Sequence, residues 1–272
     1  MSSRHSRTAR TKAGALLASA TALLSAGLLH PAPATAATTA PSGHPPGHAT
    51  AAVLDLDGTG GTPVLHGEDR AYDTASIVKV DILAALLLQA QDAGRQLTAQ
   101  ERKRAEPMIR RSNNAAANAL WRQIGRASGL AAANKRLGLT STTGGPGGKW
   151  GLTRTTASDQ IRLLRAVFGA GGAVRAGSGG LDARSRAYVR TLMSKVVPEQ
   201  SWGVSAAGTE DSGRALKNGW LERNTTGLWD VNSVGRVTVK GHRYLVAVLS
   251  DGSASMDDGV SLVERTARAA VS

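Results

Sequence analysis

The alternation of apolar and polar positions divides the chain beyond residue 48 into a hairpin, a helical block, three strands and a final helix. Segments 49–56 and 64–66 flank a Gly-rich turn and predict a β-hairpin. Segment 76–91 is apolar on nearly all sides, which is typical of a buried central helix. The pattern also predicts helices at 97–111, 115–125, 129–138, 157–168, 181–196 and 261–272, and alternating strands at 213–220, 227–239 and 242–251.

This order of elements predicts an α+β fold, because strands from both ends of the chain pair most economically in one sheet. We expect an antiparallel five-stranded sheet flanked by N- and C-terminal helices. An inserted all-helical lobe would take up residues from about 95 to 195. A cleft between the sheet and this lobe is the default place for a site.

The N-terminal segment has the features of an export signal. Four basic residues precede an apolar run at 13–29, and Ala34-Thr35-Ala36 has the small-x-small form of a cleavage site. We expect a signal peptide over 1–36, a flexible linker over 37–48 and one folded domain over 49–272. The protein would then be secreted, with no membrane span left after cleavage. The alternative is an uncleaved N-terminal anchor.

The net charge of +13 raises the question of a nucleic-acid partner. The signal segment holds four of the basic residues, and most of the remaining excess lies in residues 95–165, which carry fourteen basic and three acidic residues. Only Trp121 and Trp150 interrupt that segment as aromatics, whereas nucleic-acid surfaces usually interleave several. We therefore expect that the protein does not bind nucleic acid. The basic face would be solvated and would suit an anionic cell envelope. We also expect a monomer.

Residue types also limit the chemistry. The chain has no cysteine, which excludes a thiol nucleophile and a zinc finger. His44 and His48 are four residues apart, but two prolines between them prevent the helix that would make them a chelating pair. We expect no metal and no cofactor.

The first candidate motif is Ser76-Ile77-Val78-Lys79, at the start of the buried helix. A spacing of three puts the Ser76 hydroxyl and the Lys79 amine on one helical face. Burial among apolar residues lowers the pKa of a lysine until its amine can accept a proton from a serine nucleophile. The alternative is a helix-capping serine followed by a lysine that reaches solvent.

Two further motifs follow in the chain. One is Ser112-Asn113-Asn114, which lies between two predicted helices. Here Ser112 could relay a proton, and the Asn114 amide could hold a substrate amide. The alternative is that the motif only caps a helix. In Lys217-Asn218-Gly219, on a predicted strand, a cation beside a glycine lets a substrate carboxylate approach closely; the alternative is an edge-strand lysine.

Together, S-x-x-K, S-x-N and K-x-G in this order resemble the motif set of serine β-lactamases and penicillin-binding proteins. The likeness runs from about Ala49 to the C-terminus and is nearest to class A β-lactamases. It implies Ser76 as nucleophile, Lys79 as its base and Ser112 as proton relay. It also implies that Asn114, Lys217, Asn218 and Gly219 bind substrate, and that the backbone N–H groups of Ser76 and Trp220 form an oxyanion hole.

One departure from the family pattern concerns deacylation. Class A β-lactamases activate the hydrolytic water with a glutamate in the omega loop, but residues 107–158 contain no Asp or Glu. Asp159 lies inside the following predicted helix and is a poor substitute. Two smaller departures are Asn218 where the family usually has Thr, and Asn113 in place of Asp.

Three functions therefore remain open. The first is an exported serine hydrolase that forms an acyl-Ser76 with β-lactams or related amides and deacylates slowly. The second is a D,D-carboxypeptidase or transacylase that acts on peptidoglycan stems and is trapped by penicillin. The third is a non-catalytic module that binds a ligand at the envelope.

Overall fold

The computed structural model describes residues 47–58, 61–169 and 179–272. The expected signal peptide and nearly all of the expected linker lie outside these residues. Among the helices of this described part, none has the length and apolarity that crossing a membrane requires.

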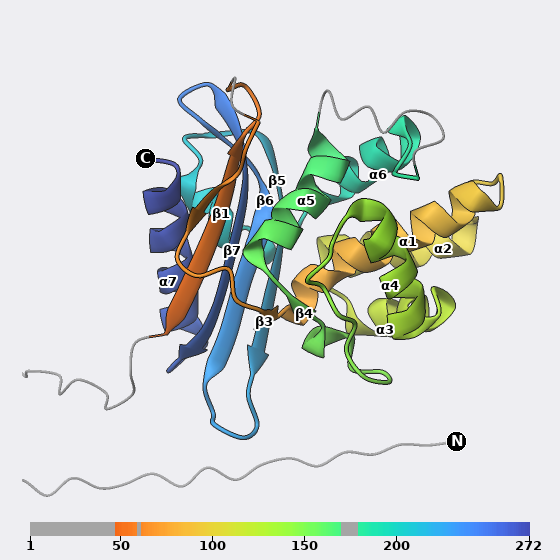
Figure 1. Cartoon of the computed structure of the whole chain (residues 1–272), viewed down its shortest axis with the longest axis horizontal. Helices are drawn as coiled ribbons and strands as arrows, with labels where there is room; N and C mark the ends of the chain where they lie inside the picture. Colours follow the sequence, from red (N-terminus) through yellow and green to blue (C-terminus); the bar gives the residue numbers. More distant parts are fainter. Residues whose placement is uncertain (1–46, 59–60, 170–178) are drawn as a thin grey trace, which may run out of the picture. The chain divides into compact units, whose positions relative to one another are not determined.

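A five-stranded antiparallel sheet forms the centre of the fold, as the sequence predicts (Figure 1). Its order is β2-β1-β7-β6-β5, so the N-terminal hairpin lies beside the last strand of the chain. The strands are β1 (His48–Asp55), β2 (Val64–His66), β5 (Glu210–Glu222), β6 (Trp229–Val239) and β7 (His242–Ser253). His48 therefore belongs to the first strand and not to the linker.

Both faces of the sheet are buried, because side chains alternate between two apolar clusters. Ala51 and Val53 of β1 join one cluster with the C-terminal helix α7 (Met256–Ala270). Ala52 and Leu54 join the other, which extends into the helices on the opposite side. The C-terminal helix covers one face as expected, but it begins five residues earlier, with Ser255 as its N-cap.

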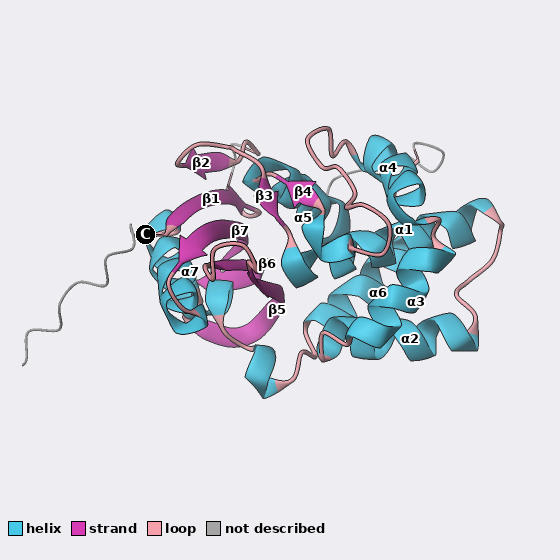
Figure 2. Ribbon diagram, turned by 90° about the horizontal axis from the view of Figure 1, so that it is seen from below, coloured by secondary structure: helices cyan, strands magenta, loops and turns pink. Residues whose placement is uncertain are grey.

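The opposite face is packed by α5 (Ala157–Phe168), while the first described helix, α1 (Val78–Asp92), is the centre of the helical lobe (Figure 2). Twelve of the fifteen residues of α1 are buried. A helix that is apolar all round needs neighbours on every side. Those neighbours are α2 (Ala99–Arg110), α3 (Asn114–Gln123), α4 (Arg126–Leu137) and α6 (Ala183–Met193).

A small second sheet connects the segment before α1 to the segment before α5. Strand β3 (Tyr72–Asp73) pairs with β4 (Arg154–Thr155) in antiparallel fashion. Strand β3 leads into the 3₁₀ turn η1 (Ala75–Ile77), and β4 follows a second 3₁₀ turn, η2 (Trp150–Leu152). The segment that carries Ser76 is thereby fixed to the end of the Gly-rich loop.

Candidate active site

Ser76 lies in the 3₁₀ turn η1 that leads into α1, rather than in the α-helix itself. Its preceding residue, Ala75, has a φ of 47°, which is costly for a residue with a side chain. The turn is held from outside: Asn232 on β6 donates from Nδ2 to the carbonyl oxygens of Asp73 and Thr74, at 2.9 and 3.2 Å. Such imposed strain at one residue next to a serine is typical of functional sites.

Lys79 lies one turn further, with its side chain fully buried. Its Nζ is 2.8 Å from Ser76 Oγ, 2.8 Å from Asn114 Oδ1 and 2.7 Å from the Ser112 carbonyl oxygen. Burial lowers the pKa of Lys79 to about 7. A substantial fraction of the amine is therefore neutral at physiological pH and can accept a proton.

Ser112 connects the two lysines. It occupies the turn between α2 and α3 with a φ of 55°, and its Oγ lies 3.1 Å from Lys79 Nζ and 2.9 Å from Lys217 Nζ. Asn113 next to it caps α3 by accepting from the Ala116 backbone N–H at 2.8 Å. The helix-cap interpretation thus applies to Asn113, while the flanking Ser112 and Asn114 both contact Lys79.

Lys217 reaches this cluster from the sheet. It is 1% exposed and also donates to the Asn218 carbonyl oxygen at 2.7 Å. Burial, together with the positive charge of Lys79, lowers the pKa of Lys217 well below its usual value. Neither lysine has a carboxylate partner among the described residues, so the cluster has an uncompensated positive potential that favours an anionic group.

Gly219 brings strand β5 against the nucleophile turn. A Cβ at this position would lie 2.6 Å from the Ser76 backbone nitrogen and 2.8 Å from that of Ile77. The approach is closer than any side chain permits, which is a physical reason for glycine here.

The structure does not bring the Asn218 side chain into the cluster, contrary to the expectation. Its Nδ2 donates to the Gln200 and Trp202 carbonyl oxygens at 3.0 and 2.9 Å, and its Oδ1 accepts from Ser233 Oγ at 2.6 Å. Successive residues of a strand face opposite sides, so Lys217 and Gly219 share one face and Asn218 points to the other. Trp220 places its ring against Trp202, with 5.9 Å between centroids, so any role of Trp220 in the site falls to its backbone.

Trp150 is a site residue that sequence reasoning missed. Its ring centroid lies 4.6 Å from Lys79 Nζ, and its Nε1 donates to Asn118 Oδ1 at 2.7 Å. Trp150 comes from the Gly-rich loop, which corresponds to the loop where class A β-lactamases carry the omega-loop glutamate. This position was the one sequence feature that could have indicated a role in the site. An open cavity of about 670 Å³ lies beside Asn114 and Trp150 and extends to residues 221–225 at the end of β5.

No acid takes the place of the missing glutamate within the described part of the chain. The Asp159 carboxylate is fully buried and accepts from the Ser141 backbone N–H, from Thr142 Oγ1 at 2.7 Å and from Arg162 at 2.5 Å. The described residues also contain no cluster of His, Asp or Glu that could hold a metal ion.

Comparison with known proteins finds a matching family profile and related sequences. A family profile described as "Beta-lactamase enzyme family" matches residues 101–272. "Putative lipoprotein LppW" of Mycobacterium tuberculosis (strain H37Rv) is 28% identical over 179 residues, which cover 64% of this chain and 54% of that protein. The chain therefore spans about half the length of the curated relatives it matches.

Solved structures share the fold at low sequence identity. PBP-A superposes with a TM-score of 0.67 at 22% identity, covering 84% of this chain and 89% of that chain. A PBP-A variant in an acyl-enzyme complex with penicillin G gives a TM-score of 0.66 at 23% identity, with coverage of 82% and 89%. A β-lactamase from Xanthomonas campestris gives 0.65 at 18% identity, with coverage of 82% and 90%.

Proposed function

The chain belongs to the beta-lactamase enzyme family, and on that premise we propose that it is an exported serine hydrolase that forms an acyl-enzyme through Ser76. Its substrates would be β-lactams or related amides that carry a carboxylate. The observation that carries this proposal is the buried Lys79 amine at 2.8 Å from Ser76 Oγ, with no carboxylate partner among the described residues. A buried ammonium without a counter-ion is costly, and a role as proton acceptor explains why this position holds a lysine.

Acylation would begin when neutral Lys79 takes the proton of Ser76 Oγ. The oxygen attacks the substrate carbonyl, and the backbone N–H groups of Ser76 and Trp220 stabilise the oxyanion. As the C–N bond breaks, Ser112 Oγ donates its proton to the leaving nitrogen and recovers one from the Lys79 ammonium. The 3.1 Å contact between Lys79 Nζ and Ser112 Oγ supports this return path.

Lys217 would bind the substrate carboxylate. Its Nζ is buried next to Ser112, and a carboxylate that binds there would favour the ammonium form, which burial alone disfavours. The Asn114 amide, which already contacts Lys79, would hold the substrate amide. Asn218 would act through its backbone and through the support it gives to β5.

Deacylation would be slow, because no carboxylate of the described residues is placed to activate a water molecule at the acyl group. Residues 107–158 hold no acid, and Asp159 is fully engaged elsewhere. The Trp150 ring covers Lys79 and lies where the loop approaches the nucleophile. A positioned general base accelerates a reaction by about 10²- to 10⁴-fold, so its absence leaves the acyl-enzyme long-lived.

Slow hydrolysis also suits the second candidate, a D,D-carboxypeptidase or transacylase that acts on peptidoglycan stems. Such an enzyme passes its acyl group to an acceptor that binds in the cleft, and the cavity beside Asn114 and Trp150 offers space for one. The name of the mycobacterial relative, a lipoprotein, supports a location at the cell envelope, where these stems occur. The proposed signal peptide over 1–36 agrees with export.

The test is intact-mass spectrometry of the mature protein incubated with penicillin G. A persistent adduct at Ser76 supports the slow acyl-enzyme, and a transient adduct with released product indicates efficient turnover. Ser76→Ala must abolish the adduct, while Asn113→Asp, which changes the neighbouring cap, must retain it. The absence of any adduct, or an adduct on Ser76→Ala, would contradict the serine assignment and favour a non-catalytic binding module.

A further inference from the structure

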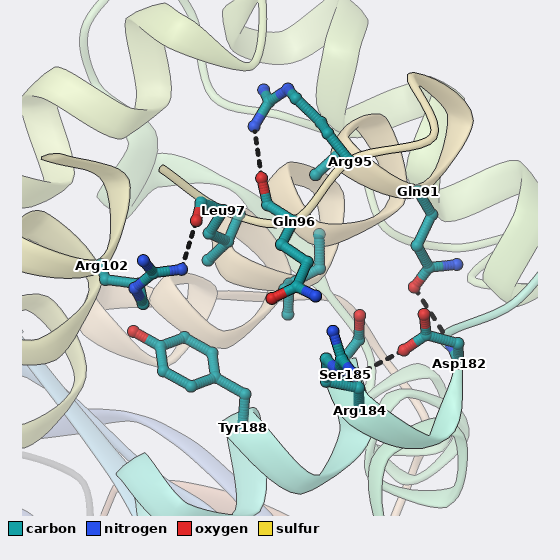
Figure 3. A pocket seen from close by; sticks show the side chains of 11 residues that line it. Gln91, Arg95, Gln96, Leu97, Arg102, Asp182, Arg184, Ser185 and Tyr188 are labelled. Atoms are coloured by element: carbon teal, nitrogen blue, oxygen red, sulfur yellow. Dashed lines mark hydrogen bonds between the residues drawn. The ribbon is translucent and has the colours of Figure 1, made fainter. Parts of the chain in front are cut away.

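A second cavity, of about 150 Å³, lies at the end of α1 remote from Ser76 (Figure 3). It is partly open to solvent and is lined by the last turns of α1, by the segment that leads into α2, and by the first turns of α6. An apolar cavity of this volume holds a ligand the size of benzene.

One side of this cavity is apolar. Leu87, Ala90 and Leu97 line it and are each at most 6% exposed, and Tyr188 of α6 lines it as well (Figure 3). These side chains belong to three different elements, so the space between them is shaped by the packing of the lobe. A flat ring would contact apolar surface on both of its faces.

The other side carries hydroxyl groups that lack partners. Ser185 is 94% buried; its backbone N–H donates to Asp182 Oδ1, but its hydroxyl has no hydrogen bond among the described residues. The same holds for the Tyr188 hydroxyl, whose pKa is raised by burial, so it remains a neutral donor. Both residues line the cavity, where each hydroxyl has space for an acceptor.

The charge of the cavity favours an anion. Arg95 forms an ion pair with Glu101 at 2.8 Å. Arg102 donates to the Leu97 carbonyl oxygen. Within the described residues, neither Arg102 nor Arg184 has a carboxylate partner. The only acidic group in the lining, Asp182, is held by the Ser185 backbone. A guanidinium binds a carboxylate through two parallel hydrogen bonds.

We propose that this cavity binds a small aromatic carboxylate, with its ring between Leu87, Leu97 and Tyr188 and its carboxylate at Arg184 and Ser185. The site is separate from the Ser76 cleft and does not depend on the proposed acyl-enzyme chemistry. A ligand there would connect α1 to α6, which Gln91 already links by accepting from the backbone N–H of Asp182, the N-cap of α6, at 3.1 Å.

Benzoate is the probe, and isothermal titration calorimetry on the mature chain is the measurement. For a ligand of this size we expect a Kd of about 0.1 to 10 mM. Benzamide has the same ring without the charge, and acetate has the charge without the ring. We expect each to bind at least about tenfold more weakly than benzoate, because each loses one half of the site.

Two variants test the assignment of the site. Arg184→Gln removes the exposed guanidinium at the cavity, and Ala90→Leu fills the ring space; each should weaken benzoate at least about tenfold. Lys103→Gln removes the same charge from an exposed position of α2 outside the cavity and should leave the affinity unchanged. Benzoate that fails to bind at about 50 mM, or that binds either cavity variant with unchanged affinity, would overturn the proposal.

Discussion

The buried carboxyl group of Asp81 makes a contribution to stability that is lost as the pH rises from 5 to 8. Asp81 lies on α1, two residues after Lys79, and is 1% exposed. Neither of its oxygens has a hydrogen-bond partner in the described structure, and the same is true of the neighbouring Gln160 Oε1. Burial raises the pKa of Asp81 from 3.8 to about 7, so the folded protein holds a neutral acid that can donate to Gln160.

The sign follows from proton linkage. Between pH 3.8 and pH 7 the unfolded chain releases this proton while the folded chain retains it, so the free energy of unfolding falls as the pH rises. From pH 5 to the folded pKa near 7, this one group costs about 3 kcal/mol, and above that pKa there is no further loss. Asp81→Asn cannot ionise, and its amide can still donate to Gln160.

The assay is urea unfolding followed by tryptophan fluorescence, for the wild type and for Asp81→Asn, at pH 5 and pH 8. We expect the stability gained through the substitution to be about 3 kcal/mol larger at pH 8 than at pH 5. Other titrating groups cancel in this difference. Asp92→Asn, at the exposed C-terminal end of the same helix, is the matched control and should show no such pH dependence. A difference below about 0.5 kcal/mol for Asp81→Asn would refute the reasoning.

Three predictions concern the reaction. The rate of Ser76 acylation by penicillin G should rise with pH with a midpoint near 7, the pKa to which burial lowers Lys79; stopped-flow kinetics that show no rise between pH 6 and 8 would contradict Lys79 as the base. Gly219→Ala should slow acylation by about 10²-fold, because its Cβ would lie 2.6 Å from the Ser76 nitrogen, and an unchanged rate would show that β5 yields without disturbing the oxyanion donors. Trp150→Leu should speed hydrolysis of the acyl-enzyme, by less than about 100-fold, since it admits water without adding a base; an adduct that is lost no faster than in the wild type, as followed by time-resolved mass spectrometry, would show that the ring does not exclude water.

Much of this fold could be predicted from the sequence, because periodicity reports burial directly. The five strands, the buried α1 and the motif residues all follow from local patterns, and the expected five-stranded antiparallel sheet is confirmed. Strand alternation alone places Asn218 on the face opposite to Lys217, although the K-x-G motif groups the two residues. Asp81 was visible as an acid within an apolar run, a conflict that indicates either a partner or a raised pKa.

Other features depend on tertiary contacts and leave no local signal. The positive φ values of Ala75 and Ser112 are imposed by surrounding hydrogen bonds, and neither residue type favours them. The contact of Trp150 with Lys79 joins residues far apart in the chain, through a loop whose glycines permit many paths. The strand order, too, requires knowledge of which distant segments pair.

That strand order has a kinetic consequence. Strand β1 pairs along its whole length with β7, the last strand of the chain, so the N-terminal hairpin has an unsatisfied edge until residues 242–253 have been synthesised. Pairing between such distant segments must first overcome the entropy of closing a long loop, and proteins of high contact order fold slowly. A nascent chain of this kind stays unfolded during most of its synthesis, in the state that a translocation channel for unfolded polypeptides accepts. The topology that buries β1 therefore also keeps the chain in an unfolded state that suits the proposed export.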